Sequence, residues 1–402
     1  MNKRKALNVV IDMVPNWYQA DCGHYKNSIS IDWEYEIFYT ERRLTPALNK
    51  FLSTAQHSLP RLLDLVKDIP DSMATELIQE SLAKKWLEQH EPRINWSKIF
   101  SYNRDLDYRT YENSSISINL LIRMGEGGFD ITDESHYKII DPLASNLNVY
   151  FEVNEDLCYR SYNYISWGEV QESKYYKFLP EFLHPFQQIK KENDWSIHKT
   201  SRGDLVILDQ DGLRATKRKG KWTIYDPQTI KNMIVDIIGY QSSYWVACNL
   251  FELLLDLSYK RHGALLIYDK FNQVSPYVTN KESLLDYDNQ HLDIIRKDMM
   301  PAICNISMAS SDSRKIKKRL LIELASMDGA VIYSDYSLTG FGCMIQAHPD
   351  AGKATGARTT AALSSYLYGG FAVKVSTDGD ITIFFTSRGP KDEKSPAKIT
   401  FL

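Results

Sequence analysis

A chain of 402 residues, with 43% hydrophobic and 25% charged residues, has the composition of an ordinary soluble globular protein and the length of two or three domains. Its net charge of −3 gives no overall sign of a nucleic-acid-binding protein. No stretch approaches the roughly 18–20 apolar residues that a membrane-spanning helix needs, so we expect no membrane partner.

The cysteines and the N-terminal segment indicate where the chain resides. Its 5 cysteines are widely spaced and form no Cys-x-x-Cys pair. This argues against a disulfide framework or a zinc site and favours a reducing compartment. The N-terminal segment is basic and then apolar, but Asp12 and Pro15 interrupt the apolar run too early for a signal peptide. We therefore expect a cytoplasmic protein.

The first 190 residues mix helix-like and strand-like segments, which predicts an N-terminal α+β domain over residues 1–190. Thr45 followed by Pro46 is typical of a helix start. Helical spacing of apolar residues covers 44–59, 60–69 and 72–90. Strands are predicted over 114–124 and 147–153, and an aromatic helix interrupted by prolines over 173–194.

Glycines follow the first of these strands, between Gly125 and Gly128. Glycines after a strand can surround a phosphate, but this set lacks the Lys-Ser/Thr of a P-loop. We expect a hairpin turn here.

Residues 191–227 predict a small β-meander that connects two domains, because short β-runs alternate with Asp-Gly and Lys-Gly turns. The meander carries a basic group, Lys217, Arg218, Lys219 and Lys221. A solvated turn is the favoured interpretation, and a local contact with phosphate or a partner is the alternative.

Residues 228–402 alternate helix and strand. Helices are predicted over 228–240, 244–260, 315–327 and 352–370, and strands over 261–269, 330–334, 341–347, 371–376 and 381–385. The strands are apolar on both faces. This predicts an α/β domain built on a mixed β-sheet with helices on both faces.

Two short motifs in this half suggest nucleotide chemistry. Asp328-Gly329-Ala330 places a carboxylate before a strand, where it could hold a divalent cation or accept a proton. The segment from Gly356 through Arg358 to Thr359 and Thr360 opens a helix, whose free N–H groups favour an anion. Arg358 adds a planar donor fork suited to phosphate. Taken alone, each motif is more typical of an ordinary turn or helix start.

Four segments taken in order resemble the catalytic domain of diadenylate cyclases, the DisA-N or DAC family, over roughly residues 228–390. They are RHGALLIYD at 261–269, ELASMDGAVIYS at 323–334, GARTTAALS at 356–364 and AVKVSTDG at 372–379. The Arg-His-Arg of the family is Arg358-Thr359-Thr360 here. That variant resembles a divergent branch with a sensor-like region before the cyclase domain.

The resemblance implies a nucleotidyltransferase that condenses two ATP molecules into cyclic di-AMP and releases pyrophosphate. It implies a homodimer or higher homo-oligomer in which two active sites face each other. Asp328 would coordinate Mg²⁺ or Mn²⁺ and help to deprotonate the attacking hydroxyl. Gly329 and Ala330 would line the adenosine. The phosphates would be held by Gly356, Arg358, Thr359 and Thr360.

Two other readings remain open at this point. The loss of the second arginine is also compatible with a catalytically inactive nucleotide sensor of the same fold. Alternatively, the N-terminal half could be the functional centre as a protein-interaction module, with the C-terminal domain as a dimerisation scaffold.

Overall fold

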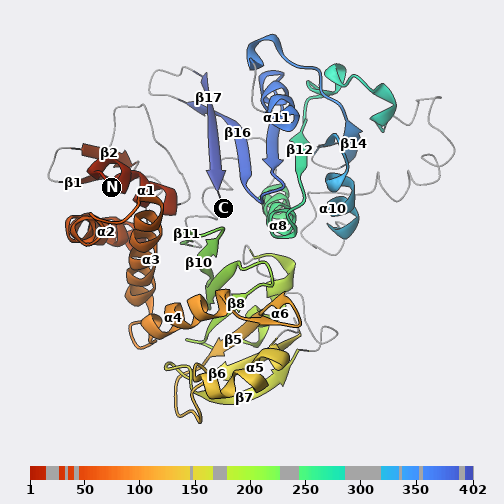
Figure 1. Cartoon of the computed structure of the whole chain (residues 1–402). Coiled ribbons are helices and arrows are strands. Elements are labelled where there is room, and N and C mark those ends of the chain that lie inside the picture. The colour runs from red at the N-terminus through yellow and green to blue at the C-terminus, as the bar shows by residue number, and fades with distance from the viewer. Residues whose placement is uncertain are drawn as a thin grey trace. The chain divides into compact units, whose positions relative to one another are not determined.

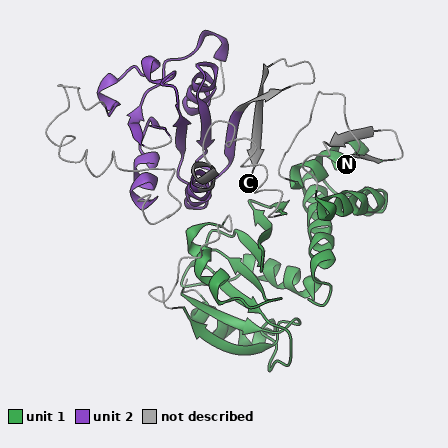
Figure 2. Cartoon of the chain, turned by 180° about the vertical axis from the view of Figure 1, so that it is seen from behind, with its two compact units in different colours: residues 1–20, 24–230 green, residues 21–23, 231–402 purple. Residues whose placement is uncertain are grey.

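The computed structural model describes residues 1–14, 27–31, 35–39, 45–144, 148–165, 179–226, 244–285, 318–334, 337–352, 356–388 and 394–401. The chain divides into two compact units (Figure 2). Unit 1 comprises residues 1–20 and 24–230, and unit 2 comprises residues 21–23 and 231–402. The helix expected at 228–240 and the part of the aromatic helix at 173–178 lie outside the described residues.

Unit 1 combines helices with a seven-stranded mixed sheet of order β11-β10-β9-β8-β5-β6-β7 (Figure 1). Its helices are α1 (Lys3–Met13), α2 (Pro46–Leu65), α3 (Asp71–His90), α4 (Trp96–Asp107), η2 (Glu134–His136), α5 (Tyr137–Ala144), η4 (Glu181–Leu183) and α6 (His184–Ile189). The strands of the sheet are β5 (Ile118–Ile122), β6 (Val149–Val153), β7 (Tyr159–Tyr164), β8 (Trp195–Lys199), β9 (Leu205–Asp209), β10 (Gly212–Arg218) and β11 (Lys221–Ile224). Two short hairpins complete it, β1 (Asn27–Ile31) with β2 (Tyr35–Tyr39) and β3 (Thr110–Tyr111) with β4 (Ser114–Ser115).

The helical part of unit 1 follows the sequence signals closely. Thr45 caps α2 by accepting a hydrogen bond from Leu48 N at 3.4 Å, and Pro46 occupies the first turn, as predicted. The helix runs on through Pro60 to Leu65, so one helix replaces the first two expected segments. Helix α3 packs on β10 and β11, and its buried Trp86 donates to Arg214 O at 3.0 Å.

The four strands of the expected meander belong to the sheet of unit 1. Strand β8 pairs antiparallel with β5, with Ile118 opposite Lys199, and β9, β10 and β11 continue the sheet outward. The expectation of a separate connector over residues 191–227 is therefore corrected, and no unit boundary lies near residue 190. The reason is that the pairing partner of β8 is a strand far away along the chain, which local pattern cannot reveal.

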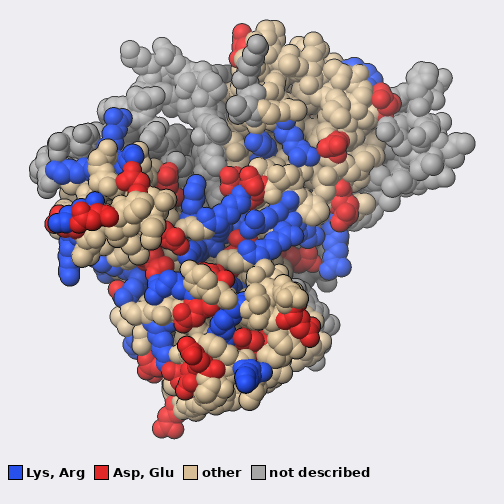
Figure 3. Space-filling model, viewed as in Figure 1, with Lys and Arg blue, Asp and Glu red and all other residues tan. Residues whose placement is uncertain are grey.

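The basic group of this meander is partly neutralised within unit 1. Lys217 lies 2.8 Å from Glu76 of α3, and Arg218 lies 3.6 Å from Asp204. Both basic residues are buried. Over the lower part of unit 1 in Figure 3, basic and acidic side chains also lie side by side. The first contact ties the meander to α3 and the second lies within the meander, so Lys217 and Arg218 are not part of an exposed basic turn.

The expectation of a hairpin turn at Gly125–Gly128 is wrong. Strands β5 and β6 are parallel neighbours, and the connection between them carries η2 and α5. Parallel strands need such a crossover and cannot be joined by a tight turn. Gly127 sits against the β6–β7 turn, where a Cβ would come within 2.6 Å of Cys158 Cβ. The glycine is needed for this close approach.

Unit 2 is an α/β unit built on a six-stranded mixed sheet of order β14-β13-β12-β15-β16-β17 (Figure 1). Its strands are β12 (Ala264–Tyr268), β13 (Ala330–Tyr333), β14 (Leu338–Cys343), β15 (Phe371–Val375), β16 (Ile381–Arg388) and β17 (Lys394–Phe401). Its helices are α8 (Tyr244–Lys260), η5 (Ser275–Tyr277), η6 (Lys281–Ser283), α10 (Lys318–Ser326), η8 (Pro349–Ala351) and α11 (Ala357–Leu367). The predicted fold class is confirmed, and β17 is an additional strand that the sequence pattern did not predict.

The core of unit 2 explains why its central strands are apolar on both faces. Leu265 and Ile267 of β12 pack with Ala362 of α11 in one hydrophobic cluster. The alternate residues of β12 point to the opposite face, and they are buried as well. Helices α8 and α10 contact each other and the sheet. Within the described ranges, every helix is too short or too polar to cross a lipid bilayer.

Candidate functional site

Asp328 and Arg358 meet at one edge of the unit 2 sheet. Arg358 Nη2 donates to Asp328 Oδ1 at 3.3 Å. Asp328 lies between α10 and the start of β13, whereas Arg358 lies in the first turn of α11. The Asp328 side chain is 92% exposed and that of Arg358 is 33% exposed. The two sequence motifs therefore converge on one solvent-accessible place.

The glycine after Asp328 fixes the turn that presents this carboxylate. Gly329 has φ +100°, a conformation that side chains rarely adopt. A Cβ at this position would also overlap the backbone of Gly342, which lies on the neighbouring strand β14. Glycine is therefore required at position 329 for two reasons: the positive φ and the close contact between β13 and β14.

Ala330 lies inside the unit. It is the first residue of β13, is 0% exposed and belongs to the hydrophobic cluster under α11. The family resemblance implied that Ala330 lines an adenosine site, but the structure places it behind the surface.

Gly263, directly before β12, lies beneath the arginine. A Cβ on Gly263 would overlap Arg358 Nη1 and would lie 3.1 Å from Thr377 Cγ2. The guanidinium of Arg358 thus packs against the backbone of Gly263, where a side chain would leave no room for it. Gly263 stands in the expected strand 261–269, but a single sequence gave no signal that this glycine seats Arg358.

The first turn of α11 presents Gly356, Thr359 and Thr360 in different ways. Gly356 is the N-cap residue, with φ 98°, and a Cβ there would meet nothing within 4 Å. Thr360 Oγ1 donates back to Gly356 O at 3.3 Å. Thr359 Oγ1 instead accepts a hydrogen bond from Lys374 Nζ at 2.8 Å. The structure brings these three residues to the same helix start as Arg358.

A histidine and a serine occupy the same edge. His262 directly precedes Gly263, and Ser326 lies two residues before Asp328. His262 Nδ1 is 2.9 Å from Ser326 Oγ. The serine hydroxyl donates to Ile322 O at 2.7 Å, so its oxygen accepts from His262. His262 is therefore a structural hydrogen-bond donor at this edge.

The described residues contain no group of three or more His, Cys, Asp or Glu side chains that could hold a metal ion. Among these described residues, Asp328 is thus not part of a cluster of three or more such side chains. Such a site cannot enclose a cation by itself. It is compatible with a cation such as Mg²⁺, which keeps several waters and takes further oxygen ligands from substrate phosphates.

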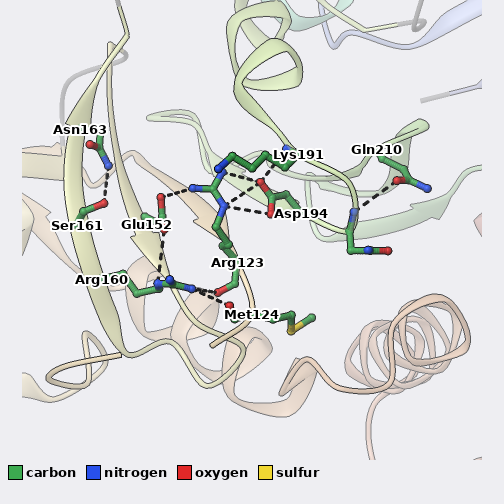
Figure 4. Close-up of polar contacts among 10 residues, drawn as sticks. Arg123, Met124, Glu152, Arg160, Ser161, Asn163, Lys191, Asp194 and Gln210 are labelled. Atoms are coloured by element: carbon green, nitrogen blue, oxygen red, sulfur yellow. Dashed lines mark hydrogen bonds and ion pairs between the residues drawn. The ribbon is translucent and has the colours of Figure 1, made fainter. Parts of the chain in front are cut away.

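Unit 1 holds a second polar cluster, which no local sequence pattern indicates. Figure 4 shows the Arg123 guanidinium between Glu152 and Asp194, at 2.6 Å and 2.7 Å. Arg160 completes the cluster by donating to the carbonyls of Arg123 and Met124, both at 2.8 Å. Asp194 also accepts from Lys191 N at 2.8 Å. The acids and bases neutralise one another, which indicates a structural role at the ends of β5 and β6.

No protein-family model and no curated protein sequence matches the chain. Among solved structures, the chain is similar to a double cysteine mutant of DacA from Staphylococcus aureus, a diadenylate cyclase. The two share 19% sequence identity over 37% of this chain and 83% of the DacA chain, with a TM-score of 0.24. At this identity and TM-score the match carries no weight for the role of any residue.

Proposed function

We propose that the chain is a nucleotidyltransferase that condenses two ATP molecules into cyclic di-AMP and two pyrophosphates. One observation carries the proposal. Asp328 and Arg358, 30 positions apart in the sequence, meet at 3.3 Å at the mouth of the sheet, as two motifs acting on one nucleotide require. The order of the four family-like segments supports the same activity.

The residues at this edge have the chemistry that phosphoryl transfer needs. Arg358 offers several N–H donors to phosphate oxygens, and its seat on Gly263 fixes the position of its guanidinium. Asp328 is exposed and can accept a proton or bind a cation. Catalysis of this kind consists mainly of positioning the reactants and neutralising charge.

A divalent cation, Mg²⁺ or Mn²⁺, fits this site only as a partner of the substrate. Asp328 would be its protein ligand among the described residues, and the phosphates would supply further oxygen ligands. The bound cation would neutralise phosphate charge. Asp328 would then exchange part of its contact with Arg358 for the cation, which frees the guanidinium for the phosphates.

The reaction consists of two identical displacements. In each, the 3′-oxygen of one ATP loses its proton and forms a bond to the α-phosphorus of the other ATP. The bond from that phosphorus to the bridging oxygen of the β-phosphate breaks, and pyrophosphate leaves. A two-fold symmetric product is best made between two copies that face each other. The exposure of Asp328 leaves room for such a facing copy.

The test is turnover by the full chain with ATP and Mn²⁺, followed by mass spectrometry of the product. We expect cyclic di-AMP from the wild type. In Asp328→Asn the rate should fall by about 100-fold or more. Asp350→Asn is the matched control, because Asp350 is an exposed aspartate of the same unit, 81% exposed, outside the site. Product formation that survives Asp328→Asn would exclude the proposed site.

A catalytically inactive nucleotide sensor is the second candidate, and a specific observation favours it. In this structure the Asp328 carboxylate is held by Arg358, and the Thr360 hydroxyl is bonded to its own helix. A bound nucleotide would have to replace both of these contacts. This candidate predicts ATP binding by calorimetry with no product, whereas Asp328-dependent turnover would eliminate it.

A further inference from the structure

Lys374 is a charged residue in an otherwise buried apolar strand. It lies in β15 between Val373 and Val375, each 0% exposed, and is itself half-buried. A lysine in such a strand loses side-chain freedom and part of its hydration. Its position therefore calls for a favourable contact at the end of its side chain.

The register of the sheet directs Lys374 toward α11. Lys374 is opposite Leu265 of β12, and directly opposed residues share a face of the sheet. Leu265 packs under α11 with Ala362. The Lys374 ammonium accordingly reaches the first turn of that helix and donates to Thr359 Oγ1 at 2.8 Å.

This contact changes what Thr359 can do. A hydroxyl oxygen can accept hydrogen bonds while its own proton donates. Because Lys374 occupies an acceptor position of Thr359 Oγ1, the hydroxyl proton is directed to a different partner. Thr359 is thus prepared as a donor next to Arg358, unlike Thr360, whose proton is used by Gly356 O.

A further cationic side chain at the site would suit the charge of a triphosphate. Arg358 and Asp328 form an ion pair, so together they contribute no net charge. A triphosphate carries several negative charges and needs cationic partners. Lys374, which contacts the Thr359 hydroxyl next to Arg358, places a second cationic side chain at this helix start.

We infer that Lys374 is a phosphate-binding residue of the nucleotide site and makes the site selective for a polyphosphate over a nucleoside. This inference rests on the proposed function, since it names the part of the same site that recognises the phosphate chain. Lys374 binds a phosphate oxygen directly and presents the Thr359 hydroxyl to another.

The experiment is calorimetric titration of the full chain with ATP and with adenosine, each in the presence of Mg²⁺. The variants are Lys374→Gln, Lys374→Arg and the control Lys270→Gln. Lys270 is an exposed lysine that follows β12 at the other end of that strand, and its substitution removes the same charge. Adenosine affinity reports whether each variant still folds around the nucleoside.

We expect Lys374→Gln to weaken ATP binding by about tenfold or more, as loss of a hydrogen bond to a charged group does. Adenosine binding should not change in Lys374→Gln. Lys374→Arg should keep most of the ATP affinity, and Lys270→Gln all of it. Wild-type ATP affinity in Lys374→Gln, or an equal loss for ATP and adenosine, would overturn the role of Lys374 alone. A wild type that binds no ATP would instead overturn the proposed function.

Discussion

Arg358 Nη1 occupies the space in which Gly263 would carry a Cβ atom, so the arginine and the glycine fit together across two segments of the chain. Gly263 directly precedes β12 of unit 2, and Arg358 lies in the first turn of α11, which covers one face of the same sheet. The same guanidinium contacts Asp328 at 3.3 Å. The position of the candidate site thus depends on a residue that has no side chain.

We predict that Gly263→Ala lowers ATP affinity by about tenfold, because the added methyl group displaces the charge-assisted donor Arg358. Stability should change little, since the displaced atoms are the end of a flexible side chain. Calorimetry with ATP measures the first effect and urea unfolding the second.

A double-mutant cycle shows whether Gly263 acts through the arginine. In an Arg358→Ala background, Gly263→Ala should have no further effect on ATP affinity, because its target is gone. If the double variant lost as much ATP affinity as the two single variants together, Gly263 would affect binding by a route other than Arg358.

The second prediction concerns the closed polar cluster of unit 1. Asp194→Asn removes the charge that faces Arg123 and leaves the guanidinium with Glu152 as its carboxylate partner. Asp194 is 4% exposed, so the loss should resemble the breaking of a buried pair, roughly 3–5 kcal/mol. Hydrogen exchange of the β5 and β8 amides measures this locally.

Glu88→Gln is the control for this prediction. Glu88 pairs with Lys84 at 3.7 Å on α3, where the Glu88 and Lys84 side chains are 45% and 35% exposed. Loss of an exposed helix pair of this kind should change stability by less than about 0.5 kcal/mol. If the two variants were equally stable, the Arg123 cluster would contribute no more to stability than an exposed ion pair does.

The third prediction is a pH dependence that originates at His198. This histidine is fully buried, and desolvation holds its pKa well below the ordinary value of 6.5. Asn119 Oδ1 and Ser196 Oγ contact its two ring nitrogens, both at 2.9 Å, and Phe186 packs against the ring. The folded state therefore holds a neutral imidazole.

Unfolding frees His198 to bind a proton, so the unfolded state binds more protons whenever the pH is below 6.5. The stability that His198 contributes is present above that pH and is lost as the pH falls toward the depressed folded pKa. We expect the free energy of unfolding to drop by up to about 1.4 kcal/mol per pH unit in this range.

His198→Asn should reduce this slope between pH 6.5 and pH 5 in urea unfolding experiments. Burial also lowers the pKa of His90, which is still present in the variant. The variant should therefore keep a smaller pH slope of the same sign. Equal slopes in the wild type and the variant would show that His198 does not carry the effect.

The sequence predicted local features well where one pattern determined them. The apolar runs of unit 2 gave β12 and α8 to within a few residues, because strands buried on both faces admit few alternatives. Strand β17 was missed because it is polar and contains Pro396, which an edge strand tolerates.

Pairing between distant segments could not be predicted in the same way. The antiparallel pairing of β5 with β8 and the parallel pairing of β5 with β6 depend on partners outside any local window. In the site, the motif residues Asp328 and Arg358 were predicted through a family resemblance. Lys374 was overlooked, although a single lysine in an apolar strand is a visible signal, because its contact with Thr359 crosses from the sheet to a helix.

The last prediction separates the two glycines of the motifs. Gly329 and Gly356 have almost the same φ, +100° and +98°, and differ in their surroundings. A Cβ on Gly329 would overlap the Gly342 backbone, whereas a Cβ on Gly356 would meet nothing within 4 Å. Both alanine variants should lose about 1–3 kcal/mol from backbone strain. Gly329→Ala should lose clearly more, because β14 must also move. Hydrogen exchange of the β13 and β14 amides measures the difference, and equal losses would show that strain alone, without the contact to Gly342, accounts for the glycine before β13.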